Sequence, residues 1–391
     1  MAHFIHTSDW HLGNSFAGFD WDTARKLNSA RLDAVKALFV YAQKKKIPFI
    51  LCAGDVIDNG QLAAESILLD LFAVVKQFPR TRLILIAGNH DPLMANTIYR
   101  RVSEESYPEN FQLARQRETI HIDDLGVKIF AASNLEKRGN ANPLNWIQPE
   151  DIEDNVIHVG LAHGSLSNEK FKDNPFPIEP GFAREKKLDY LALGDWHSYN
   201  KINGRAYYCG TPEPLQFGDE GYALHVVIEK QGAVPKVEPI KVSQYEWRRE
   251  EFELSDREFA DFKAKFGPER PGEKVIRQLS AAGFLSAKNY KIYKEIIEME
   301  RERFYKIDDR VSITPTDADF LGMGDGCMNA LLRRLIDMKT QDTPLPDEIL
   351  DHVVPADLLN LEQEFSPGKQ AVIDKALLTL HDYFRASGGE K

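Results

Sequence analysis

The chain has 391 residues, of which 43% are hydrophobic and 28% charged, and its formal net charge is −11. No apolar run approaches the roughly 20 residues of a membrane-spanning helix, and no basic segment with a long apolar stretch opens the chain, so we expect neither a membrane segment nor a signal peptide. Acidic residues outnumber basic ones in both 1–240 and 241–391, which argues against strong autonomous DNA binding through a basic face.

The first 240 residues alternate strand and helix patterns. The continuous apolar runs 47–53 and 83–87 predict strands buried on both faces. Apolar residues at helical spacing predict helices around 32–42 and 67–75. Further strands are expected at 120–122, 127–131, 156–162, 190–193, 206–210 and 223–228, with a hairpin tip at 123–126. The pattern predicts sheets packed on each other with helices outside.

The pattern changes near residue 240. Pro235, Pro239 and 242–244 predict a linker. Beyond it we expect strands at 247–254 and 275–279 and helices at 256–266, 290–304, 327–338 and 369–385. The apolar stripe of the last helix packs on the chain's own core or docks a partner. We therefore predict three parts, 1–240, a small α/β domain at 241–310 and a helical region at 311–391.

Three cysteines, Cys52, Cys209 and Cys327, are widely spaced and form no CxxC pair. The first two lie in apolar, strand-like segments. This distribution predicts buried, reduced thiols in a cytoplasmic protein and gives no indication of a structural zinc site.

Five short polar motifs follow one another in the first part of the chain. They read Asp9-Trp10-His11, Gly54-Asp55-Val56-Ile57-Asp58, Gly88-Asn89-His90-Asp91, Ala162-His163-Gly164 and Gly194-Asp195-Trp196-His197. Each of the last four comes just past an apolar strand-like run, and loops at the carboxyl ends of strands are the expected place for a site in such a fold. In three of the motifs a glycine directly precedes the first candidate ligand, where it permits tight turns and close backbone approach.

The residue types in these motifs are those that bind a pair of divalent metals. Two metals about 3.5–4 Å apart supply the nucleophile and the charge neutralisation that phosphodiester hydrolysis requires. Asp9 and His11 point the same way in an extended segment and can chelate one ion. Asp55 is suited to bridging, and Asn89 offers a neutral carbonyl oxygen. The set is completed by His163, Asp195 and His197.

His90 adjoins Asn89 and does not easily share its role. We expect it to be a general acid for the leaving oxygen or a phosphate contact, with Asp91 orienting its imidazole. Asp58 is either an acid that supports the ligands or a helix-entry residue. The other histidines are taken as strand or surface residues: His3, His6, His121, His158, His225, His352 and His381.

The ordered motifs resemble those of the calcineurin-like metallophosphoesterases, and within them the SbcD-type DNA repair nucleases. The opening at 4–13 and the later Tyr208-Cys209-Gly210-Thr211-Pro212 match the corresponding segments of these nucleases. The resemblance is strong over about residues 1–230. The resemblance implies an α+β fold, a two-sheet β-sandwich flanked by helices, with a capping domain at 241–310 and partner-docking helices at 311–391. It also implies manganese, DNA as substrate, an SMC-like ATPase partner of the SbcC type, and homodimers.

The resemblance further assigns the site residues. One metal falls to Asp9, His11, Asp55 and His197, the other to Asp55, Asn89, His163 and Asp195, and His90 becomes the proton donor. The nucleases usually read Gly-His-x-His at the fifth motif, where this chain has Asp195 as a competent but more acidic ligand.

Two other functions remain open from the sequence. The same metal core supports a phosphodiesterase or phosphatase that acts on small nucleotides or phosphoproteins. A non-catalytic metal-binding scaffold within a larger complex is the third hypothesis, although no ligand is missing and His90 is present.

Overall fold

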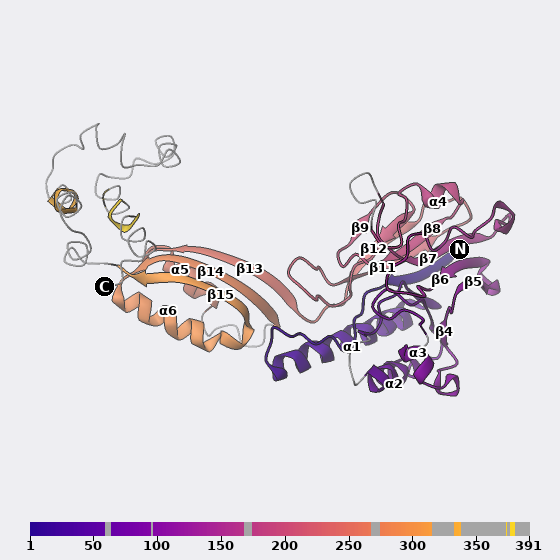
Figure 1. Cartoon of the computed structure of the whole chain (residues 1–391), viewed down its shortest axis with the longest axis horizontal. Helices are drawn as coiled ribbons and strands as arrows, with labels where there is room; N and C mark the ends of the chain where they lie inside the picture. The colour runs from indigo at the N-terminus through magenta and orange to yellow at the C-terminus, as the bar shows by residue number, and fades with distance from the viewer. Residues whose placement is uncertain are drawn as a thin grey trace. The chain divides into compact units, whose positions relative to one another are not determined.

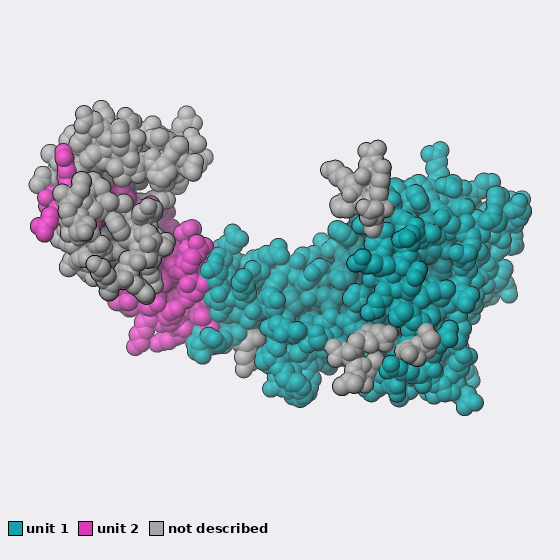
Figure 2. Space-filling model, in the orientation of Figure 1, with its two compact units in different colours: residues 1–251, 266–280, 298–308 teal, residues 252–265, 281–297, 309–391 magenta. Residues whose placement is uncertain are grey.

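The structure is a computed structural model that describes residues 1–58, 64–94, 97–167, 174–266, 274–314, 332–337, 373 and 376–379. The chain divides into two compact units (Figure 2). Unit 1 contains 1–251, 266–280 and 298–308, and unit 2 contains 252–265, 281–297 and 309–391. The three parts expected from the sequence, with boundaries at 240 and 310, stay a prediction.

Unit 1 holds two six-stranded sheets within the described residues. The first has the order β12-β11-β1-β2-β3-β4, formed by β1 (Ala2–Thr7), β2 (Phe49–Cys52), β3 (Arg82–Leu85), β4 (Phe111–Leu113), β11 (Tyr222–Ile228) and β12 (Lys236–Lys241). The second has the order β5-β6-β7-β8-β10-β9, formed by β5 (Arg117–Ile122), β6 (Val127–Ala132), β7 (Ile157–His163), β8 (Tyr190–Gly194), β9 (Asn200–Lys201) and β10 (Ala206–Tyr208).

The two sheets pack face to face over a shared apolar core. Phe4 and Leu51 from the first sheet belong to the same buried cluster as Val159 and Tyr190 from the second. The Phe4 and Tyr190 rings meet edge to face with centroids 5.5 Å apart. Strands β1 to β4 run parallel, as do β6, β7, β8 and β10. This arrangement confirms the predicted two-sheet sandwich, and it brings the carboxyl ends of the central strands of both sheets to one edge.

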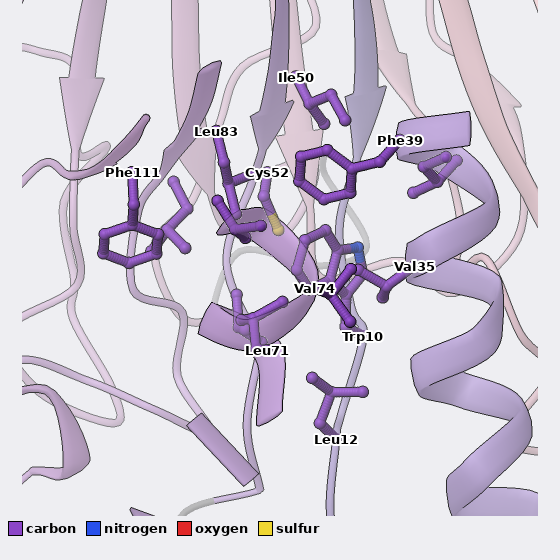
Figure 3. Close-up of a cluster of buried hydrophobic side chains, with 14 of the residues drawn as sticks. Trp10, Leu12, Val35, Phe39, Ile50, Cys52, Leu71, Val74, Leu83 and Phe111 are labelled. Atoms are coloured by element: carbon purple, nitrogen blue, oxygen red, sulfur yellow. The ribbon is translucent and has the colours of Figure 1, made fainter. Parts of the chain in front are cut away.

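Helices cover the outer face of the first sheet. The main ones are α1 (Trp21–Lys45) and α2 (Ala64–Lys76), with the short α3 (Ile98–Arg101) beside them (Figure 1). Helix α1 begins where Asp20 accepts a hydrogen bond from the Thr23 N–H and ends at Lys46 in the left-handed region. Figure 3 shows the buried side chains between these helices and the sheet. They include Trp10, Val35, Phe39, Ile50, Leu71 and Leu83.

The outer face of the second sheet is covered by loops and by the short helix α4 (Phe182–Glu185). Its buried residues include Leu144, Ile147 and Phe182, which pack on Phe130. The short 3-10 turns are η1 (Glu104–Ser106), η2 (Asp123–Leu125), η3 (Pro149–Asp151) and η4 (Arg301–Arg303). The turn η2 joins the antiparallel strands β5 and β6, which confirms the predicted hairpin.

The predicted linker after residue 234 is wrong in its central part. Strand β12 pairs antiparallel with β11 and places Pro239 opposite Leu224. Because β12 is an edge strand, the missing N–H of a proline can face away from the sheet, so proline does not prevent pairing there. The region predicted as a linker therefore contains an edge strand, in which Ile240 is the one buried residue.

The later chain contains one strand more than expected. A three-stranded sheet has the order β13-β14-β15, with β13 (Glu246–Leu254), β14 (Val275–Leu285) and β15 (Phe304–Ile313). The helices are α5 (Phe259–Phe266) and α6 (Ala287–Met299), so the helix predicted at 290–304 begins and ends earlier. Residues 332–337, 373 and 376–379 are helical, and the rest of 327–338 and 369–385, with Cys327, His352 and His381, lies outside the described residues.

Cys52 and Cys209 are buried free thiols, as predicted. None of the helices in the described ranges is long and apolar enough to cross a membrane.

A buried histidine gives the fold a pH-dependent stability. His6 in β1 lies 2.9 Å from the Tyr190 hydroxyl through Nδ1 and 3.1 Å from the Leu193 carbonyl through Nε2. Burial lowers its pKa to about 3, against a smaller raising effect of the Leu193 carbonyl. Since the folded chain keeps the imidazole neutral, its contribution is complete above the unfolded pKa of about 6.5 and is lost as the pH falls from there toward 3.

We therefore expect His6→Gln to reduce the pH dependence of stability below pH 6.5. The unsubstituted chain should lose up to about 1.4 kcal/mol of unfolding free energy per pH unit through this residue, and the variant should lack that component. Urea denaturation between about pH 5 and 7.5 measures both slopes. Equal slopes would contradict the prediction.

Candidate metal centre

The five motifs meet at the edge where the carboxyl ends of five strands converge. Asp9, Asp55 and Asn89 lie in the loops after β1, β2 and β3 of the first sheet. His163 is the last residue of β7, and Asp195 follows β8 in the second sheet. The site thus draws side chains from both sheets of the sandwich, as expected from loops that follow neighbouring parallel strands.

Asp55 lies at the centre of this group. Its Oδ2 is 3.6 Å from His11 Nε2 and 3.4 Å from His163 Nε2, and its Oδ1 accepts the His90 backbone N–H at 2.8 Å. A carboxylate with imidazole nitrogens on two sides has the position that a bridging ligand needs. The bridging role itself stays a prediction.

The other predicted ligands surround this carboxylate. His163 Nε2 is 2.7 Å from Asn89 Oδ1 and 3.9 Å from Asp195 Oδ1, and His197 Nε2 is 4.0 Å from Asp9 Oδ1. Two sets of these ligands have donor atoms that all lie within 4.8 Å of one another. They are Asp9, His11 and His197, and Asp9, Asp55 and His163. All seven predicted ligands are therefore brought together, and Asp9 is adjacent to both halves of the site.

The ring orientation of two histidines suits metal binding. His163 Nδ1 donates to the Ala53 carbonyl at 2.8 Å, and His11 Nδ1 lies 3.1 Å from Asp58 Oδ1. Metal-binding histidines usually donate their second nitrogen in this way, which fixes the ring. His11 Nε2 is buried and has no hydrogen-bond partner among the described residues. Such an atom is costly unless it binds something, so the residues present fit a divalent cation.

Four of the predicted ligands have a left-handed backbone, so the extended segment expected at Asp9 and His11 is wrong. Asp9, His11, Asp55 and Asp195 have φ values of 54°, 40°, 54° and 108°. Residues other than glycine rarely adopt this region, and where they do the surrounding structure must hold them, most often at functional sites. Here the Asp9 and His11 N–H groups donate to the Gly54 and Asp55 carbonyls at 3.0 and 2.9 Å, which locks the two loops together.

The three glycines before the ligands permit this close packing, as predicted. A Cβ on Gly54 would lie 2.7 Å from His163 Nδ1, and one on Gly194 would lie 2.1 Å from the Ala53 carbonyl oxygen. A Cβ on Gly88 would lie 2.1 Å from Asp55 Oδ1. None of these positions accepts a side chain without displacing a ligand or its support.

Gly88→Ala should therefore lower activity by displacing the central carboxylate. A misplacement of about 1 Å at a catalytic group can reduce the rate about 10²-fold, and we expect a loss of this order in kcat/KM for bis-p-nitrophenyl phosphate. Gly204→Ala is the matched control, because no atom lies within 4 Å of its added Cβ. Full activity of the Gly88 variant, together with an unchanged content of divalent metal by elemental analysis, would refute the assignment.

The buried acids give the site a negative electrostatic potential. Burial, together with the charge of Asp55, raises the pKa of Asp9 to about 6, while His163, His11 and Ser8 act to lower it. Burial acts to lower the pKa of His163, but the charges of Asp55, Asp9 and Asp195 raise it to about 10. For Asp55, the raising effect of burial is outweighed by His163, His11 and His90, and its pKa falls below the ordinary value. Divalent cations match such a cluster of negative charge.

His90 lies at the exposed edge of the site. Its side chain is 52% exposed, and its Nδ1 is 3.0 Å from Asp58 Oδ1, the same oxygen that His11 Nδ1 contacts. The hydrogen bond to Asp58 raises the pKa of His90, while burial acts to lower it. Asp58 therefore supports two histidines, the first of the two roles left open for it.

The expectation that Asp91 orients His90 is wrong. Asp91 is fully buried and accepts hydrogen bonds from the Val56 N–H at 2.9 Å, the Gly88 N–H at 2.7 Å and the Tyr99 hydroxyl at 2.6 Å. Those donors occupy both carboxylate oxygens, so Asp91 holds the loops that carry Asp55 and Asn89 rather than the imidazole.

Sequence reasoning missed several residues that support the ligands. Ser165 donates to Asp195 Oδ2 at 2.5 Å, and Asp219 Oδ2 lies 3.9 Å from His197 Nδ1. Arg31 is fully buried in α1 and donates to the carbonyls of Asp9 and Trp10 at 3.1 and 2.6 Å. The only available signal was for Arg31, which is in phase with the buried face of its helix.

Comparison with known proteins now identifies the class. The sequence pattern of the calcineurin-like phosphoesterase family matches residues 2–221, and the chain belongs to this family. It is a metal-dependent hydrolase, as the sequence motifs predicted.

Individual relatives are more distant. The chain is 27% identical over 239 residues to the Bacillus subtilis protein named uncharacterized metallophosphoesterase YhaO, covering 56% of each chain. It is 23% identical over 267 residues to the SbcD component of the nuclease SbcCD from B. subtilis, covering 57% of this chain and 65% of that protein. For the SbcD component from Escherichia coli K12 the values are 25% over 291 residues, 61% and 68%. The chain thus spans about 56–65% of the first two relatives. The predicted resemblance to SbcD-type proteins is confirmed.

Proposed function

We propose that the chain is a two-metal phosphodiesterase that cleaves DNA, as an exonuclease or endonuclease in DNA repair or processing. The observation that carries the proposal is the convergence of six ligand-type side chains around Asp55, with the partly exposed His90 beside them. Nuclease names among the relatives support DNA as the substrate. The family alone supports only phosphoester hydrolysis.

In this proposal Asp55 contributes to both metal positions, and each of the other ligands contributes to one. Asp9, His11, Asp55 and His197 hold one divalent ion, and Asp55, Asn89, His163 and Asp195 hold the other. Bound there, the ions supply Lewis-acid neutralisation of the phosphodiester charge. Manganese is the proposed metal, because the resemblance to the SbcD-type nucleases implies it.

His90 is the proposed proton donor to the leaving oxygen. Its Nδ1 contacts Asp58, so Nε2 is the nitrogen left to face the substrate. The proton on Nε2 passes to the oxygen that leaves phosphorus as the phosphodiester bond breaks, and the hydrogen bond to Asp58 keeps the ring in place.

The acidity of the chain bears on its partners. A net charge of −11 gives little unspecific attraction to DNA phosphates. We therefore propose that an SMC-like ATPase of the SbcC type supplies part of the DNA binding. The resemblance to SbcD-type nucleases leads us to propose homodimers, and the free thiols of Cys52 and Cys209 lead us to propose a cytoplasmic location. The name of the SbcCD relatives describes them as one subunit of a nuclease.

The proposal is tested with the purified full chain and manganese. Linear and hairpin DNA, bis-p-nitrophenyl phosphate, small nucleotides and a phosphopeptide are supplied in parallel, with and without an SbcC-type ATPase. We expect DNA cleavage that EDTA abolishes and that Asp55→Asn lacks. Rapid turnover of a nucleotide or phosphopeptide with intact DNA would establish the small-molecule or phosphatase function instead. Metal binding without any hydrolysis would favour a scaffold.

A further inference from the structure

An exposed tryptophan lies between two of the predicted metal ligands. Trp196 is 56% exposed and is flanked in sequence by Asp195 and His197. In a motif whose other side chains are devoted to the site, this large apolar surface has no evident part in holding a metal. Its position at the edge of the site suggests contact with the substrate.

The backbone on both sides of Trp196 is fixed. The Asp195 N–H donates to Asp9 Oδ1 at 3.2 Å, and the His197 carbonyl accepts the Thr211 N–H at 3.0 Å. Gly210 allows this approach, since a Cβ there would lie 2.8 Å from the His197 carbonyl oxygen. The indole is therefore presented from a rigid segment, and little conformational freedom of the backbone is lost when a ligand binds it.

Trp196 also differs from other tryptophans of the chain. Trp10 is buried and donates to Thr7 Oγ1, and Trp247 packs against Phe19 and Phe217. The exposed Trp21 has the Arg25 guanidinium 5.4 Å from its ring. No aromatic or cationic side chain of the described residues is within stacking distance of the Trp196 ring. Its faces are open.

The net negative charge of the chain favours a mode of nucleic-acid binding that needs no positive charge on the protein. The formal net charge of −11 gives a nucleic-acid strand little unspecific attraction to the chain. Stacking of a base on an aromatic ring needs no positive charge, and each stacked base contributes substantially to single-strand binding.

We propose that Trp196 stacks on a nucleobase next to the scissile phosphodiester of a single-stranded segment. The inference rests on the proposed DNA-cleaving function and adds how the substrate is held. It makes Trp196 a residue that favours nucleic acid over phosphodiesters without bases. Because stacking is not ionic, the part of the affinity due to Trp196 should be the same at low and moderate salt.

The test measures binding separately from cleavage. In a His90→Ala background, fluorescence anisotropy with manganese gives Kd for a single-stranded oligonucleotide and for one of the same length in which every base is absent. We expect the oligonucleotide with bases to bind about tenfold more tightly, and Trp196→Ala to remove that difference. Trp196→Phe should retain most of it, and Trp21→Ala, which removes another exposed indole, should retain all of it.

The results separate the two proposals. A preference for bases that persists in Trp196→Ala, or no binding of either oligonucleotide, would overturn the stacking role while leaving the nuclease function to its own assay. Loss of the preference in Trp196→Ala with no DNA cleavage by the unsubstituted chain would keep the base contact and reject the nuclease function.

Discussion

Replacement of His90 by alanine is expected to lower kcat for DNA hydrolysis by about 10²–10⁴-fold, the usual contribution of general acid catalysis. The side chain is 52% exposed, and its hydrogen bond is to Asp58, which is not one of the seven predicted ligands. Its ring does pack edge to face on the ligand His11, with centroids 4.7 Å apart, so the metal content of the variant has to be measured beside its kinetics. The backbone N–H that Asp55 Oδ1 accepts is unchanged by the substitution. Steady-state kinetics and metal content by elemental analysis, both on the full chain, measure the effect.

The leaving group separates the two roles considered for His90. p-Nitrophenolate leaves without a proton, so a proton donor predicts a much smaller loss with bis-p-nitrophenyl phosphate than with DNA. A residue that only binds phosphate would raise KM for both substrates and change kcat little. His121→Ala, at an exposed position in β5, serves as the control. Near-normal kcat on DNA would reject the role of proton donor.

Arg31→Met should destabilise the protein by about 3–5 kcal/mol, as expected when a buried charged group is removed and its partners are left behind. The guanidinium donates to the carbonyls of Asp9, Trp10 and Glu213 at 3.1, 2.6 and 2.7 Å. It also reaches Thr211 Oγ1 at 3.1 Å. It therefore connects helix α1, the first metal motif and the 211–214 loop. Methionine removes these hydrogen bonds and leaves the Asp9 and Glu213 carbonyls to share the single proton of the Thr211 hydroxyl.

Urea denaturation of Arg31→Met measures this change. Arg25→Met is the matched control on the same helix, because its side chain is 65% exposed and its ion pair is with the equally exposed Asp22, and it should alter stability by no more than about 0.5 kcal/mol. We also expect the Arg31 variant to bind manganese more weakly, since the Asp9 loop loses its support. Similar midpoints for the two variants would show that Arg31 is not a structural connection.

Much of the fold could be predicted because its central strands are buried on both faces. Continuous apolar runs such as 83–87 have no other simple explanation than an inner strand. The edge strands β12 and β15 lack such runs, and each has a single buried residue, Ile240 and Val311. The sequence therefore predicts a linker in place of β12 and does not indicate β15. Edge strands depend on pairing with a neighbour that the local sequence does not indicate.

In the site too, some residues could be predicted from the sequence and others could not. The seven residues predicted as ligands could be selected from the sequence because each lies in a short motif after a strand, where identity and spacing carry the chemistry. The supports were missed because they come from distant segments. Arg31 and Glu213 are 182 positions apart, and no local pattern relates them. The Asp91 prediction failed for a related reason, since proximity in sequence to His90 said nothing about the donors that surround its carboxylate.

The left-handed backbone at Asp9, His11, Asp55 and Asp195 has a consequence for engineering. Glycine adopts these φ values without steric penalty, whereas each other residue costs about 1 kcal/mol or more. Directed evolution for heat resistance alone should therefore replace these residues by glycine first. Glycine relieves the backbone strain and, at the aspartates, also the crowding of acidic side chains. A selection for more robust variants of this protein has to score turnover in every round.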